Sequence, residues 1–219
     1  YFVFSIINGI VNGNRIDILV GDIKGFIWFT LIIAMVSEID SYYKVIFTAK
    51  LLVVSGAVQA LIIFIINLLI SINPNLYSSV SSVIVRLGVG SIGVPAPGVY
   101  RIFFKSSVYL IVSYVLLLQL VAMKEVGTSA VFLAPILIFS ILISFTRSLY
   151  LAILLAVLLL MFSTLVVGFS QCLRLMRILV ITMVLSLLLI LGVQQITKVS
   201  YLTLAFERVF YSLILKQSS

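Results

Sequence analysis

One arginine interrupts a long apolar part of this chain. Arg147 lies within "LISFTRSLYLAILLAVLLLMF", residues 142–162, and two further arginines, Arg86 and Arg101, precede it. A guanidinium stays protonated and binds phosphate oxygens through parallel hydrogen bonds, so these side chains suit an anionic ligand. The alternative is that Arg147 extends from a helix start to the lipid headgroups. An arginine near the membrane interface costs little, so energy alone does not choose between the two interpretations.

Other reactive side chains are scarce. The chain has no histidine and a single cysteine, Cys172. This composition excludes an internal disulfide and removes the commonest metal ligand and general base. A metal-dependent or histidine-dependent reaction therefore cannot be completed by these residues alone. We expect no metal site and no cofactor in this part of the protein.

The composition identifies the elements that must position the arginines. Hydrophobic residues make up 63% and charged residues 9% of the 219 residues, and the mean hydropathy is +1.37. Uncharged stretches such as residues 51–72 and 148–172 exceed the roughly 20 residues that cross a bilayer. Backbone groups in lipid need partners within their own segment, so these stretches must be helices. The expected fold class is all-α, a polytopic transmembrane helical bundle.

The hydrophobic segments are separated by short polar stretches within a single transmembrane domain, residues 1–219. We expect about seven segments, at residues 1–11, 25–37, 51–72, 106–123, 130–145, 148–170 and 178–193. Residues 73–105 carry three prolines and many small polar residues, which predicts a loop, and "QCLRLMR" is predicted as a short turn. Polar residues at helical spacing after residue 199 predict an amphipathic helix in the interface. Because the chain begins at Tyr1 inside an apolar stretch, we expect it to be a piece of a longer protein.

Charge counting alone leaves the orientation open. When Lys and Arg are assigned to alternating loops, five lie on one side of the membrane and nine on the other. The positive-inside rule would make the side with nine cytoplasmic. Several of those nine lie in the longer loop, however, and an excess of arginine on the outer side is also what an anionic substrate at that surface requires.

Three stretches resemble the O-antigen ligase and O-antigen polymerase superfamily. The helical hairpin "SFTRSLYLAILLAVLLLMF" is similar to the family's Thr-x-Ser-Arg-Gly hairpin, "GVYRIFFKSSVYLIVSYVLLLQL" to its loop arginine and aromatic pair, and "IINGIVNGNRIDILVGDIKGF" to its early Gly/Asn loop. Thr146 stands where the family usually has Ser, and Ser148 where it usually has Gly. The family also carries a histidine in a large loop before its last helices, and we expect the general base to lie outside this chain.

The resemblance implies a glycosyltransferase of the plasma (inner) membrane that needs no metal or cofactor. Such enzymes move a glycan from a polyprenyl-diphosphate carrier to an acceptor glycan or lipid at the outer face, in surface polysaccharide or lipopolysaccharide synthesis. In this interpretation Arg147 and Arg101 are catalytic, and Arg86, Lys105 and Arg208 bind the substrate. Residues 73–105 and 194–219 would then be extracytoplasmic, and the partners would be the carrier-linked glycan, the acceptor and membrane lipids.

Other functional classes remain open. A flippase or transporter of lipid-linked glycans would also require outward-facing arginines, and a structural membrane subunit would tolerate their replacement. Simple loop charges are an alternative for Arg86 and Arg101, and a headgroup contact for Lys105, while Arg174 and Arg177 are interpreted as topology determinants. Nucleic acid is not an expected partner, because the basic residues are scattered over both sides of the membrane and form no stripe.

Overall fold

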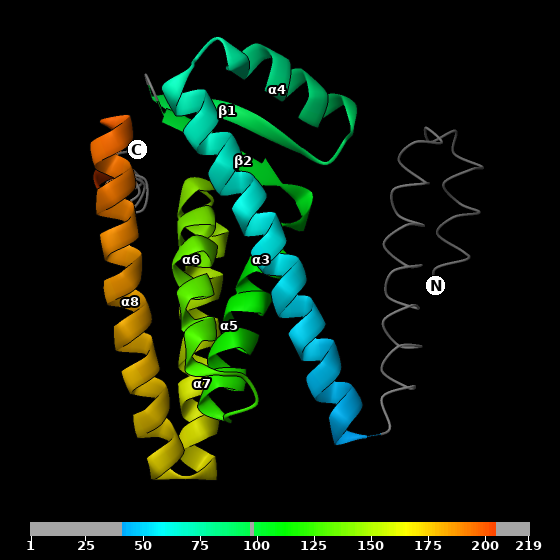
Figure 1. Cartoon of the computed structure of the whole chain (residues 1–219), viewed down its shortest axis with the longest axis vertical. Coiled ribbons are helices and arrows are strands. Elements are labelled where there is room, and N and C mark those ends of the chain that lie inside the picture. The colour runs from blue at the N-terminus through cyan, green and yellow to red at the C-terminus, as the bar shows by residue number, and fades with distance from the viewer. Residues whose placement is uncertain (1–40, 97–98, 205–219) are drawn as a thin grey trace, which may run out of the picture. The chain divides into compact units, whose positions relative to one another are not determined.

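The computed structural model describes residues 41–96 and 99–204. The chain divides into two units, residues 1–45 and 46–219, and nearly all of the described residues belong to the second. Its elements, shown in Figure 1, are α3 (Tyr42–Ile72), α4 (Leu76–Arg86), β1 (Gly90–Ala96), β2 (Val99–Phe104), η1 (Lys105–Ser107), α5 (Val108–Ala122), η2 (Thr128–Leu133), α6 (Ala134–Ile143), α7 (Arg147–Val167) and α8 (Phe169–Thr197).

Four described helices are long and apolar enough to cross a membrane: Tyr42–Ile72, Lys105–Ala122, Ser148–Val167 and Phe169–Thr197. A shorter apolar helix covers Thr128–Ile143. The outer faces of α7 and α8 carry exposed aliphatic side chains, including Leu159 (69% exposed) and Leu188 (60% exposed). Such surfaces suit hydrocarbon and not water. The chain is therefore a multi-pass membrane protein.

The helical part of the predicted fold is confirmed, and the predicted number of segments only in part. Each of the five segments expected between residues 51 and 193 overlaps a described helix, counting the shorter helix Thr128–Ile143. Their bounds differ, because the segments 106–123 and 130–145 extend past the helix ends at Ala122 and Ile143, and the segment 148–170 crosses the junction at Gly168. The segments expected at residues 1–11 and 25–37 lie outside the described residues. The structure is mostly helical, and it departs from the all-α prediction in one place, where β1 and β2 form a two-stranded antiparallel sheet.

The stretch predicted as a loop, residues 73–105, contains α4 and this hairpin. Ile92 pairs with Ile102 and Gly93 with Arg101, and both isoleucine side chains are buried. The Tyr77 hydroxyl on α4 donates a hydrogen bond to the Ile92 carbonyl over 3.3 Å. Two strands alone are marginal, so packing against α4 and against the end of α6 supplies the missing support.

The junction between α7 and α8 also differs from the prediction. The stretch "QCLRLMR" was expected to be a turn, but it lies inside α8, and Gly168 alone joins the two helices. At 1.5 Å per residue the 29 residues of α8 extend roughly 44 Å, more than the roughly 30 Å hydrocarbon core. The first turns of α8, with their arginines, can thus continue the helix into the interfacial layer.

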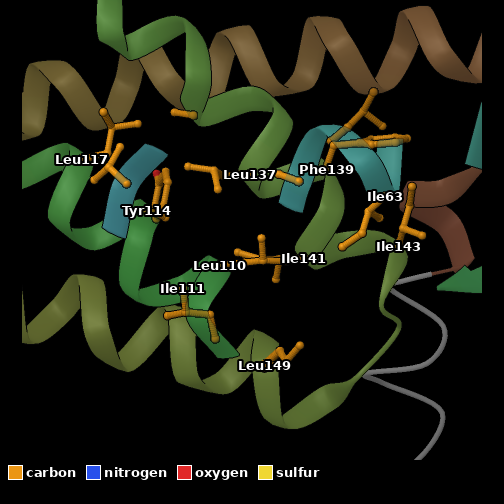
Figure 2. Close-up of a cluster of buried hydrophobic side chains, with 14 of the residues drawn as sticks. Ile63, Leu110, Ile111, Tyr114, Leu117, Leu137, Phe139, Ile141, Ile143 and Leu149 are labelled. Carbon is orange, nitrogen blue, oxygen red and sulfur yellow. The ribbon is translucent and has the colours of Figure 1, made fainter. Parts of the chain in front are cut away.

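The core lies where α5 and α6 meet, with contributions from α3 and α7. Figure 2 shows this cluster, which includes Ile63, Leu110, Tyr114, Leu117, Leu137, Phe139, Ile141, Ile143 and Leu149. A hydroxyl group also connects two of these helices: Ser140 on α6 donates a hydrogen bond to the Ala60 carbonyl on α3 over 2.9 Å. In a bilayer, close packing and interhelical hydrogen bonds of this kind hold helices together.

Candidate functional site

Arg101 connects the hairpin to the turn between α6 and α7. Its Nε donates to the Ser144 carbonyl over 2.9 Å, and its terminal nitrogen donates to the Thr146 hydroxyl over 3.4 Å. The guanidinium also lies over the Phe103 ring, 5.8 Å from the ring centroid. Arg101 and Phe103 are two residues apart on one strand, so both side chains leave the same face of β2. This geometry ties a strand to the residues that directly precede Arg147.

The α6–α7 turn is held by hydrogen bonds within its own residues as well. The Ser144 hydroxyl donates to the Ile141 carbonyl over 2.6 Å, and the Thr146 hydroxyl donates to the Ser144 carbonyl over 3.0 Å. The Tyr150 hydroxyl, one turn into α7, donates back to the Leu142 carbonyl over 2.5 Å. The Ile141 and Leu142 carbonyls also accept from the Ser144 and Phe145 amides, so hydroxyl and amide donors together satisfy the carbonyl groups at the end of α6. The turn therefore has one defined geometry, which fixes where α7 begins.

The start of α7 has the electrostatic character of an anion site. Thr146 is its N-cap in an extended conformation, and no side-chain cap hydrogen bond forms at this end of the described helix. The Thr146 carbonyl accepts from the Leu149 and Tyr150 amides, while the first amides of a helix have no carbonyl partner of their own. Unpaired amides and the helix dipole favour negative charge at such a position. Arg101 adds a fixed cation at the same turn.

The structure brings some of the predicted site residues together and separates others. Arg147 is the first residue of α7, directly after the turn that Arg101 holds, although its side chain lies outside the described part. Lys105 follows β2 and is exposed, as is Arg86 in the last turn of α4. No hydrogen bond, ion pair or ring contact among the described residues joins these two cations to Arg101. Arg208 lies outside the described residues.

An apolar groove of about 690 Å³ begins beside this turn and runs between α6, α7 and α8. Leu142 and Tyr150 line it next to the turn, and Ile153, Met183 and Leu187 are among the residues that line it farther along. Its polar lining is limited to hydroxyl groups such as those of Tyr114 and Ser186. A cationic turn at one end of an apolar groove is complementary to an amphiphile with an anionic headgroup.

Sequence reasoning missed the residues that shape the turn. Tyr150 carries no signal of its function, because a tyrosine near a membrane interface is usually a belt residue. Ser144 and Phe145 likewise sit in an apolar run without any turn signature. The bond between Arg101 and the Ser144 carbonyl joins residues 43 positions apart, a pairing that no local pattern in one sequence reveals.

Comparisons with protein-family models, curated proteins and solved structures find no match to this chain.

Proposed function

We propose that this chain is part of a membrane glycosyltransferase that moves a glycan from a polyprenyl-diphosphate carrier to an acceptor at the outer face of the plasma membrane. The observation that carries the proposal is the hydrogen bonding of Arg101 to Ser144 and Thr146, directly before Arg147. It supports a common location for the two arginines that the resemblance assigns to the diphosphate. The orientation with this turn outside rests on the same resemblance.

In the proposed reaction an acceptor hydroxyl attacks the anomeric carbon of the carrier-linked sugar. The carbon–oxygen bond to the diphosphate breaks, and polyprenyl diphosphate leaves with the bonding electrons. Negative charge therefore grows on the leaving diphosphate, and preorganised cations stabilise that charge most effectively where water is scarce. Arg147 would bind the diphosphate through its planar fork, assisted by the first amides of α7 and by Arg101. The hydroxyl proton passes to a base other than these two arginines.

The groove beside the turn suits the other half of the carrier. Its apolar lining between α6, α7 and α8 would accept isoprenoid units while the diphosphate stays at the α7 start. Tyr150 lies at the boundary between the two environments, because its ring lines the groove and its hydroxyl bonds the end of α6. This arrangement favours a lipid-linked donor over a soluble sugar nucleotide.

The proposal is tested by Arg147→Lys in the full-length protein. Lysine keeps the charge but loses the two parallel hydrogen bonds, so we expect glycan transfer to fall by about a hundredfold, the effect of removing one preorganised donor. Expression and membrane insertion are expected to be unchanged. Arg177→Lys is the matched control, because Arg177 is exposed and lies in α8 far along the chain from the turn. Full activity of Arg147→Lys, or an equal loss of activity in both variants, would contradict the proposed binding of the diphosphate by Arg147.

A flippase of the same lipid-linked glycan is the second candidate, since the cationic turn and the apolar groove suit its substrate equally well. The two functions differ in whether a covalent bond breaks. A change in glycan length or linkage that depends on Arg147 favours the transferase. A change only in the side of the membrane on which the intact carrier-linked glycan is found favours the flippase.

A further inference from the structure

A second groove lies at the opposite end of the bundle from the Arg101 turn. It has a volume of about 420 Å³ and lies between the end of α5, η2 and the first half of α8. Since α7 runs away from the turn and α8 starts at its far end, this groove belongs to the other membrane surface (Figure 1). Its lining includes Thr128, Ser129, Phe132, Arg174, Ile181 and Leu185.

Arg174 is the charged residue in the lining of this groove, and it is half-buried. It forms no hydrogen bond or ion pair within the described part of the chain. Among the described residues ten are Lys or Arg, and Glu125 is the one acidic residue. A partly desolvated guanidinium is costly without a counter-charge. The counter-charge therefore has to come largely from outside the described chain.

The remaining lining specifies the chemistry of the partner. Thr128 and Ser129 bring hydroxyl groups that can donate to phosphate oxygens. Phe132 (66% exposed) and Ile181 (51% exposed) provide apolar walls. A free phosphate ion would make no use of these walls, and a zwitterionic lipid carries its own cation next to the phosphate. An anionic phosphodiester with attached acyl chains satisfies the arginine, the hydroxyls and the walls together.

We propose that this groove binds one anionic glycerophospholipid of the bilayer, with its phosphate on Arg174 and an acyl chain along α8. The site lies apart from the α6–α7 turn and does not depend on glycan transfer. Its selectivity comes from Arg174, because charge-assisted hydrogen bonds to phosphate are the strongest contacts that the lining offers. General electrostatic attraction between anionic lipids and the basic residues at this end of the bundle is less specific, since it acts on any of those residues.

Arg177 is a matched control on the same helix. It carries the same charge three residues after Arg174, is exposed, and does not line the groove. The test uses the full-length protein in detergent with phosphatidylglycerol, phosphatidylcholine or inorganic phosphate. Native mass spectrometry measures bound lipid, and the apparent melting temperature measures stabilisation. We expect one phosphatidylglycerol to bind preferentially and to raise the melting temperature.

Arg174→Gln is expected to weaken phosphatidylglycerol binding by about tenfold, the equivalent of one hydrogen bond to a charged group. Arg174→Lys is expected to retain part of the affinity, and Arg177→Gln all of it. Ile181→Trp tests the site without altering its charge, because the indole fills the groove and should displace the lipid. Equal losses in Arg174→Gln and Arg177→Gln would overturn the site, as would equal stabilisation by phosphatidylcholine or by inorganic phosphate, or unchanged binding to Ile181→Trp.

Discussion

At the scale of single residues, two of the three described non-glycine residues with a left-handed backbone differ in what compensates the strain. Phe145 (φ 45°) follows the end of α6, and Lys198 (φ 57°) is the C-cap of α8. Glycine is the usual residue at such helix ends, because a Cβ atom crowds the backbone there. Phe145 is only 2% exposed, so its ring packing offsets the strain. Lys198 is exposed and has no comparable compensation.

This contrast predicts opposite effects of glycine at the two positions. Lys198→Gly should stabilise the protein by up to about 1 kcal/mol, since it relieves the backbone without loss of packing. Phe145→Gly should destabilise it, because burial of the ring is lost, and Phe145→Ala should be less stable still by about 1 kcal/mol because the strain remains. Apparent melting temperatures in detergent measure the order. A Phe145→Ala variant more stable than Phe145→Gly would contradict the explanation.

Arg101 shows how far residue types alone could predict the candidate site. The resemblance of its stretch to the family's loop arginine and aromatic pair selected Arg101 for an anionic ligand, whereas its residue type alone was equally compatible with a simple loop charge. Its partners were not predictable, because they depend on the β1–β2 pairing, which places Arg101 opposite Gly93, and on the contact of β2 with α6. The position of the α6–α7 turn could be predicted from Arg147. Its hydrogen bonds could not.

At the scale of elements, the contact between α3 and α5 depends on one small residue. Gly56 on α3 faces Ser113 on α5, and a Cβ atom added to Gly56 would overlap the Ser113 side chain. The Ser113 hydroxyl donates to the Leu52 carbonyl over 2.8 Å. Small residues at a helix crossing let two backbones approach closely in a membrane. The close approach of α3 to α5 therefore requires glycine at position 56.

We expect Gly56→Ala to destabilise the bundle by about 1–3 kcal/mol, the usual cost of overpacking. Ser113→Gly frees the same space at a cost of about 1 kcal/mol for glycine in a helix. The double variant should therefore be more stable than the sum of the two single changes implies, and unfolding of all four proteins in detergent measures this coupling. Strict additivity would show that the overlap is relieved by movement of the helices.

The elements differed in how well the sequence predicted them. Long apolar runs predicted the helices that cross the membrane. Length and hydropathy suffice there, because backbone groups in lipid must form their hydrogen bonds within the same segment. The hairpin was missed, since Pro95 and several glycines are typical of loops and its stability comes from packing against α4 and the end of α6. The "QCLRLMR" stretch was also misjudged: its arginines are compatible with a helix that continues into the interface, and the turn needed only Gly168.

At the scale of the whole molecule, the segment after α8 is anchored in the bundle by Tyr201. Its side chain is 0% exposed, its ring contacts Phe139 with centroids 5.6 Å apart, and its hydroxyl donates to Asn67 Oδ1 over 3.0 Å. Ser200 and Thr203 bond to each other over 2.6 Å at the surface, and most of the amphipathic helix predicted after residue 199 lies outside the described residues. The anchor was not predictable, because Tyr201 and Asn67 are 134 residues apart.

Removal of this hydroxyl tests the anchor. Tyr201→Phe keeps the ring but leaves the Asn67 side chain without this partner, and the Nδ2 atom of Asn67 already lacks one among the described residues. We expect the free energy of unfolding to fall by about 1 kcal/mol, and proteolysis after α8 to be faster than in the wild-type protein. Thr203→Val is the control, since Thr203 is exposed on the same segment. Equal proteolysis of the wild type and Tyr201→Phe would assign the anchoring to ring packing alone.

The most direct measurement of the proposed function is the fate of the carrier in detergent solution, where no membrane separates two compartments. Full-length protein in detergent is mixed with a polyprenyl-diphosphate glycan and an acceptor, and both products are quantified. Because detergent removes the membrane barrier, a flippase cannot contribute a signal. We predict that free polyprenyl diphosphate and glycan-bearing acceptor form in equal amounts, and that Arg147→Lys lowers the rate of formation of both by about a hundredfold. A carrier that stays intact in the presence of protein and acceptor would contradict the proposed transferase.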